Sequence, residues 1–130
     1  MNLTFIMARG LRIERGELGA AVFDATGVYR YLLLRDGGGT RGPIAWVMLN
    51  PSTATAHVDD PTIRRVRGFS RDWGYGEVRI VNAFGLRSTD PKALAQAIRD
   101  GRDPIGPDND FCIQLAVRDG GTWAEIVGTS

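Results

Sequence analysis

The chain has 130 residues and a mass of 14.2 kDa, which is the size of one domain. Its 43% hydrophobic and 24% charged residues are ordinary for a globular protein and exclude disorder, collagen and a disulfide scaffold. A net charge of +1, from 16 basic and 15 acidic residues, excludes a global field that would attract nucleic acid or a membrane. Any binding to nucleic acid or a membrane must therefore use a local patch of charge. From the length of the chain, we expect one domain over residues 1–130.

Cysteine content and hydropathy indicate the compartment. Cys112 is the only cysteine of the sequence, so the chain can form neither an internal disulfide nor a cysteine cluster for zinc. The longest apolar run, residues 44–49, is far shorter than the roughly 20 residues that span a bilayer. The sequence therefore predicts a cytoplasmic protein that has no membrane partner.

The first elements predict a hairpin and then a buried strand. Residues 19–24 and 28–35 are rich in apolar, β-branched and aromatic side chains, and the Ala-Thr-Gly at 25–27 suits a turn between them. A glycine-rich loop over 36–43 leads into the apolar run 44–49. This run does not alternate with polar residues, which is typical of a strand buried on both faces.

A helix is predicted next, because Asp60 is a good N-cap and Pro61 suits the first helical position. Helical spacing is shared by Ile63, Val66, either Phe69 or Ser70, and Trp73. We expect the side chains of Ile63, Val66 and Trp73 to be buried. The positions between them carry arginines that should stay largely exposed, namely Arg64, Arg67 and Arg71.

Strands and helices alternate in the rest of the chain. Residues 78–84 form a second apolar strand, and two more helices are expected over 91–100 and 109–118. A last strand is expected over 123–127. Because such alternation favours parallel βαβ units, the predicted fold is a three-layer α/β/α sandwich with a mostly parallel sheet and an N-terminal β-hairpin.

Polar residues stand where the two central strands should end, and ligands of open α/β sheets bind at the carboxyl ends of strands. Asn50 closes the first apolar run, and Asn82 lies near the end of the second. Each carboxamide could read the amide edge of a base or orient a water molecule across one crevice, or it could simply tie loops through backbone hydrogen bonds. Ser52 and Thr53 could contact phosphate or cap a turn.

Three further features each allow a functional and a plain structural interpretation. His57, the only histidine, lies in a polar loop without a nucleophile motif and is interpreted as a surface residue. Asp59 and Asp60 could bind a divalent cation, although helix capping explains Asp60 more simply. The arginines between positions 64 and 71 could contact phosphates or form a solvated helix face.

Five short motifs together resemble the bacterial and phage family known as domain of unknown function 1643 (DUF1643). The resemblance covers about residues 20–110 and rests on Asn50-Pro51-Ser52-Thr53-Ala54, Asp59-Asp60-Pro61-Thr62-Ile63, Val81-Asn82-Ala83-Phe84, Arg87 with Thr89-Asp90-Pro91, and Asp103-Pro104-Ile105-Gly106.

A weaker resemblance is to the uracil-DNA glycosylase superfamily, and it implies a fold of that type. In that superfamily a motif similar to Asn50-Pro51 positions the hydrolytic water, and an asparagine placed like Asn82 pairs with the flipped base. The superfamily's His-Pro loop has no counterpart in this sequence. We therefore expect the chain to lack a C-terminal segment of its family.

These features together predict recognition of a nucleobase or nucleotide, with hydrolysis of an N-glycosidic bond as the reaction that could follow. The alternative is a non-catalytic binding module, or a decayed and truncated remnant of the family. The expected partner is nucleic acid or a nucleotide, and no metal or organic cofactor is required. The predicted catalytic residue is Asn50, and the predicted binding residues are Pro51, Ser52, Thr53, Asp60, Asn82, Phe84 and Arg87.

Overall fold

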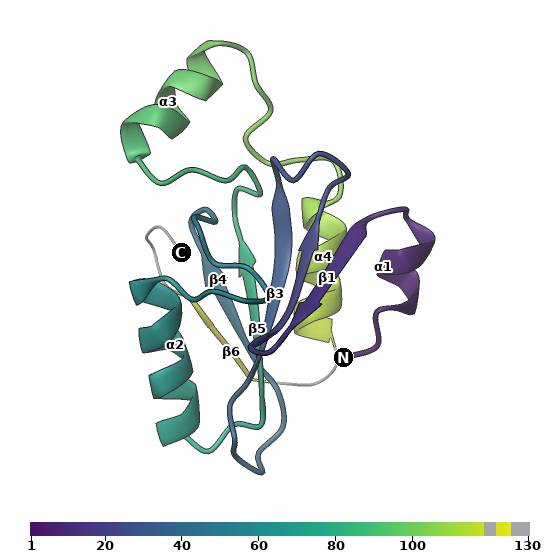
Figure 1. The fold of residues 1–130 in the computed structure, drawn as a ribbon, viewed down its shortest axis with the longest axis vertical. Helices are drawn as coiled ribbons and strands as arrows, with labels where there is room; N and C mark the ends of the chain where they lie inside the picture. The colour runs from purple at the N-terminus through teal and green to yellow at the C-terminus, as the bar shows by residue number, and fades with distance from the viewer. Residues whose placement is uncertain (119–121, 126–130) are drawn as a thin grey trace.

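The computed structural model describes residues 1–118 and 122–125, and its centre is a six-stranded sheet of order β1-β2-β3-β5-β4-β6 (Figure 1). The strands are β1 (Arg12–Gly16), β2 (Gly19–Phe23), β3 (Arg30–Asp36), β4 (Ile44–Met48), β5 (Glu77–Asn82) and β6 (Thr122–Glu125). The helices are α1 (Thr4–Ala8), α2 (Pro61–Asp72), α3 (Pro91–Arg99) and α4 (Asn109–Arg118). Residues 126–127 of the predicted last strand lie outside the described residues.

The predicted fold, an α/β/α sandwich, is wrong in its sheet, which is mixed rather than mostly parallel and glycosylase-like. The pairs β1–β2, β2–β3 and β3–β5 are antiparallel, and only β4–β5 and β4–β6 are parallel. The physical reason is that the first three strands follow one another through short connections, which allow only antiparallel neighbours. Because β3 also pairs with β5, with Leu33 opposite Ile80, the hairpin is continuous with the parallel strands.

Helices pack on both faces of this sheet, and each face has its own apolar core. On one face, α2 contributes Ile63 and Val66 to a core with Trp46 and Ile80. On the other face, α1 and α4 pack over a core that includes Val81. The third helix, α3, lies beyond the carboxyl ends of β4 and β5 (Figure 1). Within the described part of the chain, no helix is both long and apolar enough to cross a membrane.

The structure confirms how α2 begins but not how its last turn packs. The Oδ1 atom of Asp60 accepts a hydrogen bond of 2.8 Å from the backbone N–H of Ile63 and so caps the helix. Ile63 and Val66 are buried as predicted, whereas Trp73 is 47% exposed. Ser70 takes the inward position instead, and its Oγ accepts a hydrogen bond of 2.9 Å from Trp46 Nε1. Trp73 is the C-cap residue of the helix, and its ring stacks on the ring of Trp46.

The arginines of α2 follow the prediction in part. Arg64 and Arg71 are exposed, but Arg67 is half-buried. The cause is an ion pair of 2.6 Å between Arg67 Nη1 and Asp59 Oδ2, which draws the side chain back toward the start of the helix.

The substitution Ile63→Ala should lower the free energy of unfolding by about 2–5 kcal/mol, because it leaves a cavity under α2. Arg65→Ala, on the exposed side of the same helix, should change it by less than about 0.5 kcal/mol. Urea denaturation of both variants measures the difference. Equal stabilities would show that α2 is not anchored through Ile63.

Candidate functional site

The two strand-end asparagines lie at the ends of neighbouring parallel strands, as the sequence predicts. Asn82 is the last residue of β5 and pairs in register with Met48, the last residue of β4. Asn50 lies two residues beyond Met48. The pairing continues past the strands, because the backbone N–H groups of Ala83 and Phe84 donate to the carbonyls of Met48 and Leu49, each at 2.8 Å. The two outgoing segments therefore leave the sheet together.

Asn50 holds these two segments to each other. Its side chain is buried, and Nδ2 donates hydrogen bonds of 3.1 Å to the carbonyl oxygens of Pro51 and Ser88. The backbone N–H of Ser88 also donates to the Pro51 carbonyl at 2.8 Å. The loop-tying interpretation of Asn50 therefore describes what its amide nitrogen does in this structure.

Asn82 lies too deep to meet a ligand directly. Its residue is fully buried, and its backbone carbonyl accepts a hydrogen bond of 2.8 Å from Asn109 Nδ2. Asn109, from the start of α4, also donates to the carbonyl of Ala83. In this conformation Asn82 therefore connects the end of β5 to the start of α4. Phe84, two residues further along the chain, is half-buried.

A pocket of about 390 Å³ opens above these residues, and we call it the strand-end pocket. Of the predicted binding residues, Ser52, Thr53 and Arg87 line it, whereas Pro51, Asp60, Asn82 and Phe84 do not. The other lining residues were not predicted from the sequence; they are Ser88, Thr89 and Ala93.

Among the described residues, Arg87 is the one charged residue that lines the strand-end pocket, and the protein orients it. Its Nε donates to the Ser52 carbonyl at 3.3 Å, and Nη1 donates to the Gly27 carbonyl at 3.1 Å. Its guanidinium also lies over the Phe23 ring, 5.1 Å from the centroid. Partial burial lowers the pKa of Arg87 from its usual value.

The acidic pair before α2 is used structurally. Asp60 caps the helix, and Asp59 accepts from Arg35 Nε at 2.8 Å and from Arg67 Nη1 at 2.6 Å. Burial tends to raise the pKa of Asp59, but the hydrogen bonds from Arg67 and Arg35 outweigh it and keep the pKa low. Over the described residues, no group of three or more His, Cys, Asp and Glu side chains could hold a metal ion.

His57 is exposed, as predicted. The distance between its Nδ1 atom and Glu17 Oε2 is 3.0 Å. The hydrogen bond with Glu17 raises the pKa of His57 above its usual value. The cysteine cannot use it as a base, because Cys112 is buried in the core on the α4 face, where burial raises the pKa of its thiol to about 12.

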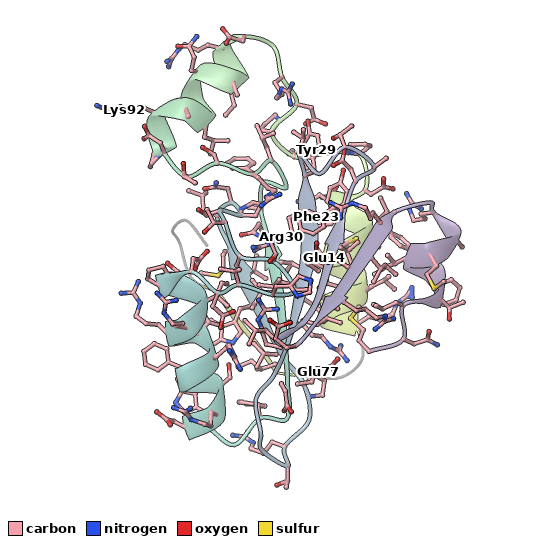
Figure 2. All side chains as sticks on the ribbon, viewed as in Figure 1. Glu14, Phe23, Tyr29, Arg30, Glu77 and Lys92 are labelled. Carbon is pink, nitrogen blue, oxygen red and sulfur yellow. The ribbon has the colours of Figure 1, made fainter. Side chains whose placement is uncertain are left out.

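Arg30 is a buried charged residue that sequence reasoning missed. It lies in the interior at the start of β3 (Figure 2), is fully buried, and donates from Nη1 to the Ala54 carbonyl at 3.0 Å. Its Nε and Nη2 atoms have no hydrogen-bond partner among residues 1–118, and neither has Oδ2 of Asp60. Burial lowers the pKa of Arg30 to about 9, against the opposing charge of Asp60. The sequence feature that could have indicated a buried arginine is its position within the apolar run 28–34.

The fold and pocket define a class of α/β protein in which two loops that follow parallel strands line an open pocket. The family described as "Protein of unknown function (DUF1643)" matches residues 30–127, and the chain belongs to this family. No curated protein and no solved structure matches the chain. The resemblance to uracil-DNA glycosylases and the expected C-terminal truncation therefore gain no support.

The substitution Asn50→Ala should destabilise the protein by about 1–3 kcal/mol, because it removes the donor to the Ser88 carbonyl and one of the two donors to the Pro51 carbonyl. Gln114→Ala, at an exposed position of α4, is the control. Urea denaturation compares the two variants. An unchanged midpoint for the Asn50 variant would contradict the loop-tying role.

The substitution Arg30→Met should change the free energy of unfolding by less than about 2 kcal/mol, because removal of a buried charge offsets the loss of the hydrogen bond to the buried Ala54 carbonyl. Thermal and urea unfolding measure this outcome. A loss of 3 kcal/mol or more, on the order expected when a buried ion pair is broken, would show that Arg30 is paired in solution.

Proposed function

We propose that this protein binds a nucleotide through its phosphate group in the strand-end pocket. The observation that carries this proposal is the lining of that pocket: four hydroxyl residues surround one oriented arginine at the ends of β4 and β5. Hydroxyls donate hydrogen bonds to phosphate oxygens, and a guanidinium binds phosphate with a planar fork of N–H donors. The hydroxyl residues are Ser52, Thr53 and Thr89, together with Ser88, whose Oγ already donates its proton to the Asp90 carbonyl at 2.8 Å.

The size and position of the strand-end pocket support a small organic phosphate rather than a bare ion. Its volume of about 390 Å³ falls in the range of small-molecule sites. It also opens at the strand ends where α/β sheets commonly bind ligands.

Binding is better supported than hydrolysis of an N-glycosidic bond. A hydrolytic role for Asn50 would require its carboxamide to hold the attacking water, whereas Nδ2 already donates to two backbone carbonyls. A base-reading role for Asn82 would require access to a residue that is fully buried. The function that fits these contacts is that of a binding module.

The test is a titration with nucleoside 5′-monophosphates and with the parent nucleosides, followed by calorimetry. Wild-type protein should bind the monophosphates at least tenfold more tightly than the nucleosides. Ala93→Leu should weaken monophosphate binding at least tenfold, because Ala93 lines the pocket and a leucine would occupy it. Ala97→Leu, one turn further along α3, makes the same change of side chain outside the lining and should bind like the wild type.

Two results would overturn the proposal. One is equal affinity for nucleosides and monophosphates, which would show that phosphate is not recognised. The other is unchanged binding in the Ala93→Leu variant, which would place the ligand elsewhere. Release of free base from a nucleotide, lost in a folded Asn50→Ala variant, would show instead that the protein is a hydrolase.

A further inference from the structure

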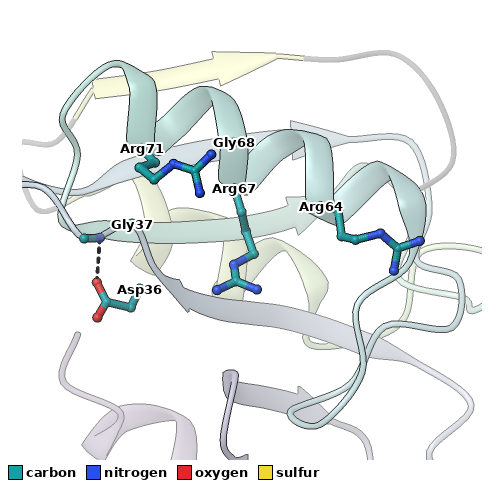
Figure 3. A pocket seen from close by; sticks show the side chains of 7 residues that line it. Asp36, Gly37, Arg64, Arg67, Gly68 and Arg71 are labelled. Carbon is teal, nitrogen blue, oxygen red and sulfur yellow. Dashed lines mark hydrogen bonds between the residues drawn. The ribbon is translucent and has the colours of Figure 1, made fainter.

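A second cavity of about 500 Å³ lies along α2, away from the strand-end pocket, and we call it the arginine groove (Figure 3). One wall is a flank of α2, and the other is the turn that follows β3. The lining residues are Asp36, Gly37, Gly38, Arg64, Arg67, Gly68 and Arg71.

Three guanidinium groups line one wall of the arginine groove. Arg64, Arg67 and Arg71 are three and four residues apart, so their side chains share one flank of the helix. Arg67 is held by Asp59. Within the described residues, Arg64 donates only to the neutral backbone carbonyl of Asp59, at 3.2 Å. Arg71 lies 3.9 Å from Asp72, and both side chains are more than two-thirds exposed, so the pair is weak. The charges of Arg64 and Arg71 are therefore available to a ligand.

The presence of glycine at position 68 distinguishes this groove from an ordinary solvated helix face. Gly68 lies in the middle of α2, where glycine is less stable than alanine. A Cβ atom added there would meet no atom within 4 Å, so contacts within the protein do not require a glycine. Its absent side chain keeps the floor of the arginine groove open.

The opposite wall is also shaped by glycine, for a different reason. A Cβ atom on Gly37 would lie 2.2 Å from the backbone oxygen of Tyr75, so the turn can pack here only with glycine. Gly38 has a φ of 78°, and its N–H donates to Asp36 Oδ1 at 2.7 Å. These contacts fix the turn facing the arginines.

We propose that the arginine groove binds a ligand that carries two or more neighbouring phosphate groups. Arg64 and Arg71 are seven positions apart, which is about 10 Å along the helix axis. Figure 3 shows the guanidinium groups of Arg64, Arg67 and Arg71 spread along the groove. A single phosphate is too small to contact both ends. A run of phosphates, in a phosphoanhydride chain or in a nucleic acid backbone, supplies several negative charges at this spacing, and arginine binds each by its fork of donors.

The test uses two probes, tripolyphosphate and a single-stranded deoxythymidine 12-mer, and two variants of equal charge. The groove variant Arg64→Gln/Arg71→Gln should lose at least tenfold in affinity for a probe that uses the groove. The control variant Arg65→Gln/Arg99→Gln removes two exposed arginines outside the lining and should lose less than threefold. Two lost phosphate contacts, at about 0.7 each, should also reduce the slope of log affinity against log salt by about 1.4 for the 12-mer.

Gly68→Ala gives a second readout that a purely structural role would not produce. The variant should unfold at a higher temperature than the wild type, because alanine favours the helix, and yet bind the probes more weakly. A more stable variant with unchanged affinity for both probes would show that the floor of the groove does not contact the ligand, and would contradict the proposal.

The outcomes with the two probes identify the source of the phosphates. A groove-dependent loss with tripolyphosphate alone indicates a free phosphate chain, a loss with the 12-mer alone indicates a nucleic acid strand, and a loss with both supports the shared chemistry. Equal losses in the groove and control variants, or no binding of either probe at low salt, would overturn the proposal. Ala93→Leu leaves the residues of the arginine groove unchanged, so the part of probe binding that the groove variant removes should persist in it. A failure of the nucleotide proposal is thereby distinguishable from a failure of this one.

Discussion

The antiparallel pairing of β3 with β5 is the constraint on which the other features of the structure depend. It joins the N-terminal hairpin to the parallel strands as one sheet, with Leu33 opposite Ile80. It also brings the two ends of β3 to the two cavities. Arg30, at the start of β3, comes under the loop at Ala54, and Asp36, at its end, faces α2 across the arginine groove.

Buried arginines and an asparagine hold the long loop between β4 and α2 in place. Arg35 donates to the carbonyl oxygens of Thr55 and Val58, and Arg30 donates to that of Ala54. Backbone carbonyls of a buried loop have no strand or helix to pair with, so side-chain donors must satisfy them. The Arg35–Asp59–Arg67 contacts then connect this loop to α2. The start of α2, and with it the position of Arg64, is thereby fixed relative to the sheet.

The two cavities present arginine in different ways. Arg87 is partly buried, and two carbonyls and an aromatic ring orient its side chain. The guanidinium is therefore oriented before a ligand binds. Arg64 and Arg71 are exposed on a helix and keep their rotamer freedom, so a ligand must order them on binding. A preorganised group favours selectivity for one small ligand, whereas mobile exposed charges favour salt-dependent contact with an extended polyanion.

Local chemistry was enough to predict the elements whose causes lie in adjacent residues. The cap and proline at Asp60 and Pro61 defined the start of α2, and the apolar runs located Asn50 and Asn82 at the ends of neighbouring strands, because these signals act within a few residues. The tertiary structure alone decided the direction of β3, since nothing near it in the sequence records its pairing with β5. It also decided that Trp73 is exposed, that Asn82 is buried below the pocket and that Ser88 lines it. Burial and cavity lining depend on elements distant in sequence, and no local pattern encodes them.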